Sequence, residues 1–273
     1  VVFNYIFVFG HFGAPEMGIA GAALGSVLAE ATAALDFFLY TFFYIDRGKY
    51  QLFRLRSGGF GLIREILNVS VWSMILYFLT IGTWFLFFVA VEHLGELPLA
   101  ISNIIRSTST LLFMPVNAFG ATACTLVSNA MGARRADDVI PIVRRIVKMC
   151  YAIVLPLIAL LCLAPHWILL IYTNDSSLIA ECTHSVYVMS SFYLIALPGN
   201  ILFQSVSGTG DTRTAFLIEM ITIVFYTLAI YWIIVTLRVD IAFCWTVEYI
   251  YWGFKLLLSF LFFKKMNWEV KKI

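Results

Sequence analysis

Polar, charged and aromatic residues recur inside long apolar segments of the chain, at spacings that place them on single helical faces. Two such stripes are Ser73, Tyr77, Thr80 and Trp84, and Asn103, Arg106, Thr110, Phe113 and Asn117. A polar group within a membrane is costly, so each stripe indicates either helix–helix hydrogen bonding or a shared water-filled cavity. Packing explains any single Ser or Thr, but several stripes with aromatic and charged members favour a cavity. We therefore predict that both stripes line a shared water-filled cavity.

Acidic residues also lie inside these segments, at Glu30, Asp36, Glu219 and Glu248. Because a charged group within a membrane is costly, the positions of these four carboxyl groups carry functional information. With a rise of about 1.5 Å per residue, Arg106 reaches the depth of Glu248, and Lys255 reaches that of Glu219 on the next antiparallel helix. Two intramembrane ion pairs are expected, Arg106–Glu248 and Glu219–Lys255. They serve either packing or gating.

The octet SGTGDTRT at 207–214 is glycine-rich and polar, which raises the question of nucleotide binding. A phosphate-binding P-loop needs a Lys that is absent here, and a dinucleotide fingerprint needs Gly where the chain has Arg213. Both nucleotide functions are excluded. Gly208 and Gly210 suit a helix end and a tight turn, and Asp211 suits the N-cap of the next helix.

Enzyme and metal chemistry find no support in the sequence. The five Cys residues are scattered, without the Cys/His spacing of a zinc site. The four His residues (11, 93, 166 and 184) lie at or near the ends of the apolar segments, and no nucleophile–base pair shares one depth. We expect no catalytic residue, no bound metal and no cofactor.

The composition indicates a polytopic membrane protein. Of 273 residues 62% are hydrophobic and 12% charged, against about 25% charged in soluble domains. Seven apolar segments are long enough to span a bilayer, and the absence of ten-residue alternating strands argues against a barrel. The predicted fold class is all-α, with spans near 18–44, 65–91, 97–128, 139–172, 180–206, 214–237 and 240–264. A net charge of +2 gives no indication of nucleic-acid binding.

Lys and Arg residues predict the orientation of the spans. Fifteen of the 18 basic residues fall in alternate loops, in the span ends next to those loops or at the C-terminus, and only Arg238 lies in the opposite loops. By the positive-inside rule, loops 45–64, 131–139 and 207–214 and the C-terminus are cytoplasmic. The expected location is the plasma membrane, with the bilayer itself as partner.

The first ten residues, VVFNYIFVFG, are apolar but too few to cross a bilayer. We expect the chain to start inside a helix and to be the C-terminal part of a longer protein. Residues 19–43 can be laid on residues 241–265, a faint repeat that suggests two lobes of equal topology. The predicted organisation is the end of one lobe over 1–44, a linker over 45–64 and a second lobe over 65–273.

Four stretches carry a resemblance to a known family: FNYIFVFGHFGAPEMGIAGAALGSVLAE (3–30), GTWFLFFVAVEHLGELPLAISNIIRS (82–107), PVNAFGATACTLVSNAMGARRADDV (115–139) and SGTGDTRT (207–214). In these, and in their order, the chain resembles the multidrug and toxic compound extrusion (MATE) family of antiporters. The resemblance implies twelve helices in two six-helix lobes. This chain would hold one complete lobe, helices 7–12, and the last one and a half helices of the other.

The resemblance also implies a function. MATE-like proteins export amphipathic, often cationic, drugs or toxic compounds across the cytoplasmic membrane by alternating access, while H+ or Na+ runs in. The substrate would lie in a cavity between the lobes. The implied partners are a small-molecule substrate and the lipid bilayer, with no nucleic acid, no obligate protein partner and no cofactor beyond the coupling ion.

The family's coupling residues are only partly matched. Sodium-type members carry acids in helices 7 and 10, but residues 66–91 contain none and the helix 10 position falls at Ala196. Proton-type members depend on an Asp in helix 1, which this chain does not contain, and many have an Asp in helix 5 where this chain has Asn4. The coupling role is thus expected of Glu30, Asp36, Glu219, Glu248 or Asn4, or of helices outside this sequence.

Two other transport functions are weighed against the exporter. A lipid-linked oligosaccharide flippase of the same superfamily would line its cavity with more Arg and Lys to hold pyrophosphate, whereas only Arg106 and Lys255 lie well inside the spans. The flippase stays as the alternative. A channel would need a repeated filter segment, and none is visible.

Overall fold

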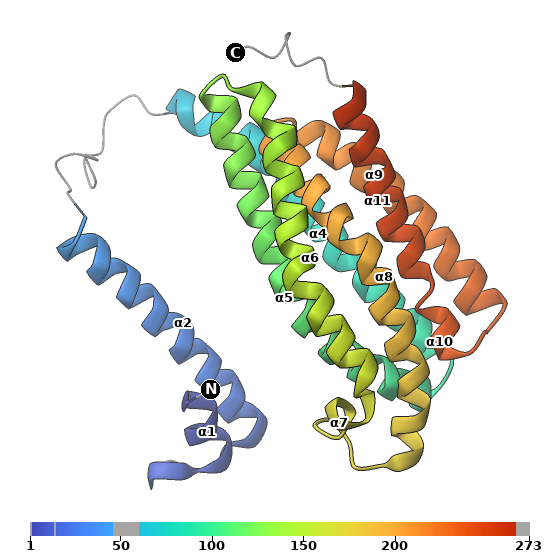
Figure 1. Cartoon of the computed structure of the whole chain (residues 1–273). Helices are drawn as coiled ribbons and strands as arrows, with labels where there is room; N and C mark the ends of the chain where they lie inside the picture. Colours follow the sequence, from blue (N-terminus) through green and yellow to red (C-terminus); the bar gives the residue numbers. More distant parts are fainter. Residues whose placement is uncertain (1, 14, 46–59, 266–273) are drawn as a thin grey trace. The chain divides into compact units, whose positions relative to one another are not determined.

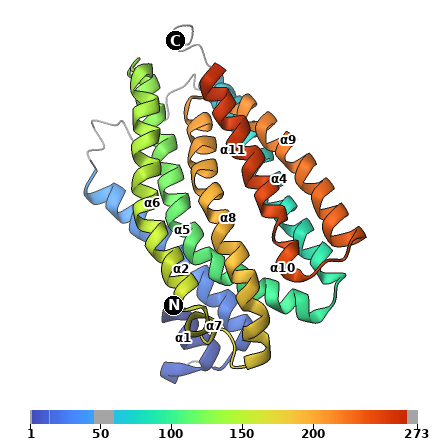
Figure 2. The same ribbon diagram turned by 45° about the vertical axis from the view of Figure 1, so that its right-hand side comes forward.

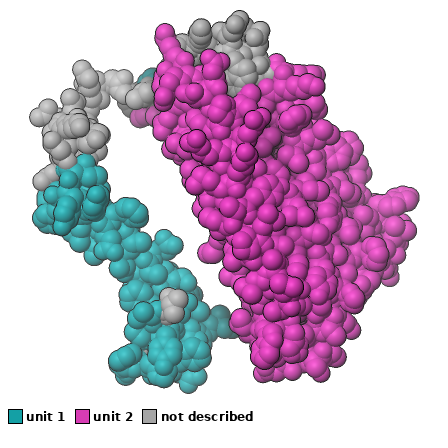
Figure 3. Space-filling view, in the orientation of Figure 1, with its two compact units in different colours: residues 1–61 teal, residues 62–273 magenta. Residues whose placement is uncertain are grey.

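The computed structural model describes residues 2–13, 15–45 and 60–265. They belong to two compact units, Val1–Gly61 and Leu62–Ile273 (Figures 1 and 3). Every regular element in these ranges is a helix, and seven helical segments are long and apolar enough to cross a membrane. The predicted all-α, multi-pass fold class is therefore confirmed. The seven segments are Gly18–Phe43, Ile66–Glu92, Glu96–Gly132, Ala136–Leu163, Ser176–Gly208, Thr212–Thr236 and Ile241–Lys265.

The first unit is built on α1 (Val2–Phe9), a short 3-10 turn (His11–Gly13) and α2 (Gly18–Phe43). Two glycines of α2, four residues apart, allow α1 to approach closely. A Cβ at Gly21 would overlap the carbonyl of Phe7, and one at Gly25 would overlap the side chain of Asn4. This spacing of small residues is the usual means by which two helices pack backbone to backbone in a membrane.

The second unit is organised around α8 (Ser176–Gly208), which packs against α5 (Glu96–Gly132), α6 (Val139–Leu163) and α11 (Val247–Lys265) (Figures 1 and 2). Of its 33 residues, 17 are buried, which explains why α8 shows no single apolar face. The helices α4 (Phe60–Glu92) and α9 (Thr212–Ile230) complete the part of the unit that forms the site.

The octet at 207–214 forms the turn predicted for it. The helix α8 ends at Gly208, Gly210 adopts a left-handed φ of 82°, and Asp211 caps α9 by accepting from the amide of Thr214 at 3.1 Å. Gly208 has a second role, since a Cβ there would lie 2.5 Å from the carbonyl oxygen of Cys124 on α5. The octet is thus a structural turn in which α8 meets α5 closely.

Several boundaries differ from the predicted ones for local reasons. The span expected over 139–172 ends at Leu163 because Pro165 cannot donate the next backbone hydrogen bond, and the short α7 (Pro165–Leu169) follows. A turn at Trp245 and Thr246 divides the last span into α10 (Ile241–Cys244) and α11. The helix α9 continues as a π-helix over Tyr231–Thr236.

The predicted linker 45–64 is seen only in part. Its last five residues belong to α4, which begins at Phe60, and residues 46–59 lie outside the described residues. Residues 266–273 at the C-terminus also lie outside them.

Three prolines lie inside the long helices, Pro115 in α5, Pro156 in α6 and Pro198 in α8. Pro198 has no N–H, so the carbonyl of Leu194 loses its partner within the helix. The hydroxyl of Tyr151 on α6 donates to that carbonyl at 2.6 Å. A neighbouring helix thus supplies the hydrogen bond that the proline removes.

We expect the Tyr151→Phe substitution to lower the free energy of unfolding by about 1–3 kcal/mol, because the Leu194 carbonyl is left without a donor. The measurement is thermal unfolding of the purified full-length protein in detergent. In a Pro198→Ala background the restored N–H can bond the same carbonyl, so Tyr151→Phe should then cost much less. An equal loss in both backgrounds would contradict this account. Tyr187→Phe, at an exposed tyrosine of α8, is the control.

Candidate functional site

The second unit contains a cavity of about 660 Å³ between α4, α5, α8, α9 and α11. Its aromatic lining consists of Tyr77, Trp84, Phe113, Phe203, Tyr251 and Trp252. Its uncharged polar lining consists of Ser73, Thr80, Asn117, Asn200, Gln204, Ser207 and Thr212. Mostly apolar walls with a few placed polar groups, at this volume, are typical of a small-molecule binding site.

The structure places six of the nine members of the two predicted stripes on this lining: Ser73, Tyr77, Thr80 and Trp84 of α4, and Phe113 and Asn117 of α5. The other three, Asn103, Arg106 and Thr110, lie on the same helix as Asn117 but do not reach the cavity. Arg106 precedes Asn117 by 11 residues, which is about 16 Å along the helix axis. The α5 stripe continues past the end of the cavity, so its first members face other surroundings.

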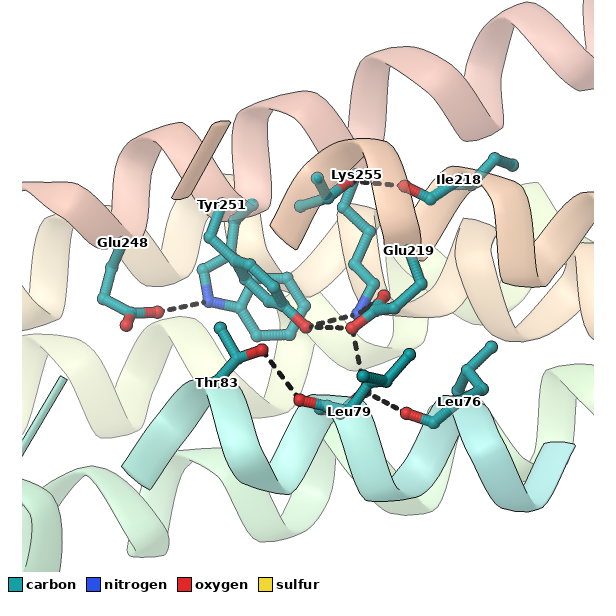
Figure 4. Close-up of polar contacts among 11 residues, drawn as sticks. Leu76, Leu79, Thr83, Ile218, Glu219, Glu248, Tyr251 and Lys255 are labelled. Atoms are coloured by element: carbon teal, nitrogen blue, oxygen red, sulfur yellow. Dashed lines mark hydrogen bonds and ion pairs between the residues drawn. The ribbon is translucent and has the colours of Figure 1, made fainter. Parts of the chain in front are cut away.

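Glu219 of α9 and Lys255 of α11 form a buried ion pair beside the cavity, with Lys255 Nζ 2.8 Å from Glu219 Oε2. Their side chains are almost inaccessible, and the whole residues are 0% and 4% exposed. Tyr251 Oη donates to Glu219 Oε1 at 2.7 Å (Figure 4). The hydroxyl of Thr80 lies 2.8 Å from the same oxygen. The carboxylate therefore has partners on both oxygens, which a buried charge requires.

Lys255 is held by aromatic rings as well as by Glu219. Its Nζ donates to Tyr251 Oη at 2.8 Å and lies 4.2 Å from the ring centroid of Phe203 and 5.2 Å from that of Trp252. Among the described residues that line the cavity, Lys255 is the one charged side chain. Because Glu219 balances its charge, this face of the cavity is close to neutral.

Glu248 lies one turn of α11 before Trp252 and is 3% exposed. It accepts from Tyr226 Oη at 2.7 Å and from Trp252 Nε1 at 3.1 Å. The predicted pair with Arg106 is absent from the described residues: no cation lies within 4.0 Å of Glu248, and the Arg106 guanidinium lies 5.2 Å from the ring centroid of Phe88. Although Arg106 and Glu248 were expected at equal depth, they do not pair, because the neutral donors Tyr226 and Trp252 bind the Glu248 carboxylate.

A second, smaller cavity of about 50 Å³ adjoins Glu248. Its lining is Trp84, Ser109, Thr110, Phe113, Phe192, Tyr193, Trp245, Glu248 and Trp252. Three of these aromatic residues, Trp84, Phe113 and Trp252, also line the 660 Å³ cavity. We call the two spaces the large cavity and the Glu248 cavity. Aromatic side chains thus separate the buried carboxylate from the large cavity.

The remaining coupling candidates belong to the first unit. Asn4 packs against Gly25, whereas Glu30 and Asp36 have exposed side chains on α2. Their role in ion coupling stays a prediction.

Several lining residues of the large cavity were not predicted from the sequence. Asn200, Phe203, Gln204 and Ser207 all come from α8, where they recur at three- and four-residue intervals. The same rule that singled out α4 would have found them. Because α8 is buried on nearly all sides, apolar residues flank these polar residues in the sequence and the polar face does not stand out.

Comparisons with known proteins bear on the family and the fold of the chain. The sequence profile of the MatE family matches residues 73–232. Over 293 aligned residues the chain is 26% identical to a probable multidrug resistance protein NorM of Thermotoga maritima, covering all of this chain and 59% of that protein. It is 27% identical over 194 residues to a probable multidrug resistance protein NorM of Haemophilus ducreyi, covering 66% of this chain and 40% of that protein.

Solved structures share the fold. The chain matches the outward-facing conformation of a multidrug resistance MATE family transporter of the MOP superfamily with a TM-score of 0.80, at 16% identity, over all of this chain and 60% of that one. A MOP superfamily transporter from Pyrococcus furiosus, described as having a binding pocket of reverse polarity, matches with a TM-score of 0.78 at 15% identity, with the same coverage. The chain thus spans about three fifths of the length of these proteins.

Proposed function

Because this chain belongs to the MatE family of multidrug efflux transporters, we propose that the full-length protein exports amphipathic compounds, coupled to the inward movement of H+ or Na+. The large cavity carries this proposal. It would be the half of the substrate site contributed by this lobe, and alternating access would open it to the two sides of the membrane in turn.

The lining supports amphipathic, often cationic, substrates. Flat aromatic side chains such as Trp84 and Trp252 offer both apolar contact and cation–π attraction. The side-chain amides of Asn117, Asn200 and Gln204 can donate hydrogen bonds to a bound compound through NH2 or accept them from it through the carbonyl oxygen. Since Glu219 neutralises Lys255, the lysine on the cavity wall does not repel a positively charged compound strongly.

We also propose that the protein lies in the plasma membrane with its basic loops in the cytoplasm. Among the described residues, Arg64, Arg134, Arg135, Arg213 and Lys264 lie in or next to loops 45–64, 131–139 and 207–214 and the C-terminus. This is the distribution that the positive-inside rule associates with the cytoplasmic side.

The flippase alternative is less well supported by the lining. A pyrophosphate group would need several Arg or Lys side chains to bind it. Lys255 alone is available among the described lining residues, and Glu219 already pairs with it.

We expect the full-length protein in proteoliposomes loaded with ethidium to release the dye when an inward proton or sodium gradient is imposed. Efflux under one gradient and not the other would identify the coupling ion. Protein-free liposomes and vesicles with the gradient collapsed by an ionophore are the controls. Absence of dye movement under either gradient would contradict the exporter and turn the search to lipid-linked substrates.

A further inference from the structure

Glu248 differs from Glu219 in one respect that bears on coupling: it has no counter-charge. Both carboxylates are buried, but Glu219 has Lys255 at 2.8 Å while the partners of Glu248 are neutral donors. A buried carboxylate that is not paired with a cation is costly in its charged form. Proton uptake removes this cost at Glu248, whereas at Glu219 it would leave Lys255 without its partner.

The groups that face Glu248 leave its charge uncompensated. The titratable and charged ones are Tyr226 on α9, Tyr193 on α8, and Tyr251 and Lys255 on α11. Lys255 lies two helical turns away and is already paired with Glu219. The helices α4 and α5 contribute only uncharged residues to the Glu248 cavity.

The partners of Glu248 suit a proton better than a metal ion. Tyr226 and Trp252 both direct hydrogen atoms at the carboxylate, and a metal cation would face those hydrogens. The described residues contain no cluster of three or more His, Cys, Asp or Glu side chains that could surround a metal. The Glu248 cavity has room for water, and the buried Nε1 of Trp245 on its wall has no hydrogen-bond partner among the described residues. Water there could deliver a proton.

Trp252 connects this carboxylate to the large cavity. Its indole N–H donates to Glu248 Oε2, while its ring lines the large cavity and lies 5.9 Å from the ring of Phe113, centroid to centroid. From this geometry we propose that Glu248 is a proton-binding site of this lobe and that Trp252 transmits its protonation state to the substrate. The inference rests on the proposed export function and specifies its coupling site.

The coupling step is the addition of one proton to one carboxylate oxygen of Glu248. Charged Glu248 holds Trp252 through a charge-assisted hydrogen bond and attracts a cationic compound. Protonation removes the negative charge and weakens that bond, so the indole no longer has a fixed position on the cavity wall. Substrate affinity is therefore high when Glu248 is deprotonated and low when it is protonated, which is the exchange that an antiporter needs.

The test measures dye affinity as a function of pH in the full-length protein in detergent, together with proton release upon dye binding in weak buffer. For the wild type we expect affinity to fall about tenfold or more from alkaline to acidic pH, and dye binding to release protons. Glu248→Gln should bind weakly at every pH, with little pH dependence and no proton release. Trp252→Phe, which keeps a ring but loses the N–H, should retain a protonatable Glu248 while the pH dependence of affinity shrinks severalfold.

Trp84→Phe is the matched control, since Trp84 lines both cavities, whereas the hydrogen bonds to Glu248 come from Tyr226 and Trp252. Its affinity should change by the same factor at every pH. The inference is overturned if dye affinity of the wild type does not depend on pH, or if Glu248→Gln still releases protons. A wild type that moves no dye under any gradient would refute the export function instead, so the two failures are distinct.

Discussion

Replacing Glu219 with Gln is expected to lower the free energy of unfolding by about 3–5 kcal/mol, because the substitution leaves the buried ammonium group of Lys255 without its counter-charge. Lys255 Nζ lies 2.8 Å from the carboxylate, and neither residue is more than 4% exposed. Thermal unfolding of the full-length protein in detergent measures the effect. Glu181→Gln, at an exposed acid on α8, is the control and should change little.

The double variant Glu219→Gln/Lys255→Met distinguishes an ion pair from simple packing. With both charges removed, the stability should return most of the way to that of the wild type, since a buried pair and an apolar pair of similar volume are often equal in energy. The two single losses should therefore not add. Additive losses would show that each side chain acts alone and would refute the pairing as the cause.

Ser73→Trp should weaken dye binding about tenfold or more, equivalent to about 1.4 kcal/mol or more. Ser73 lies on the α4 side of the large cavity, so an indole at this position would fill space that a substrate needs. Fluorescence titration of the full-length protein with ethidium measures the affinity, and unfolding measurements check that the variant is folded.

Ser107→Trp provides the comparison for Ser73→Trp. Ser107 is an exposed residue of α5 whose hydroxyl donates to the carbonyl of Asn103, and it does not line the large cavity. The same change of residue there should leave the affinity within about twofold, because no substrate contact is lost. Equal losses at the two positions would mean that the large cavity does not bind the dye.

The spans and one face of the site could be predicted because they depend on local periodicity. The α4 residues Ser73, Tyr77, Thr80 and Trp84 repeat at helical intervals, and the structure places all four on the large cavity. The helices α9 and α11 follow each other in antiparallel directions, so equal depth was enough to bring Glu219 to Lys255. The face of a helix and the depth of a residue follow from residue spacing and helix length, so both can be predicted without knowing how the helices pack.

What could not be predicted depends on how each helix is rotated about its axis. Arg106 and Glu248 were expected to pair from depth alone, but the donors of Tyr226 and Trp252 occupy the carboxylate and Arg106 lies near Phe88. Asn200 and Gln204 were missed because α8 is buried on most sides, so a polar face does not stand out in its sequence. Rotation is decided by the packing of all the neighbouring helices together.

The hydrogen bond from Tyr151 to the carbonyl of Leu194 has a mechanical consequence for the large cavity. Residues of α8 that line the cavity, from Asn200 to Ser207, all follow Pro198 in the sequence. A bend of α8 near Pro198 would separate the Tyr151 hydroxyl from the Leu194 carbonyl. It would break no backbone hydrogen bond from residue 198, because Pro198 has no N–H. The hydrogen bond from Tyr151 of α6 therefore contributes to the stiffness of the α8 wall of the cavity. A movement of α6 that breaks this bond would make α8 easier to bend.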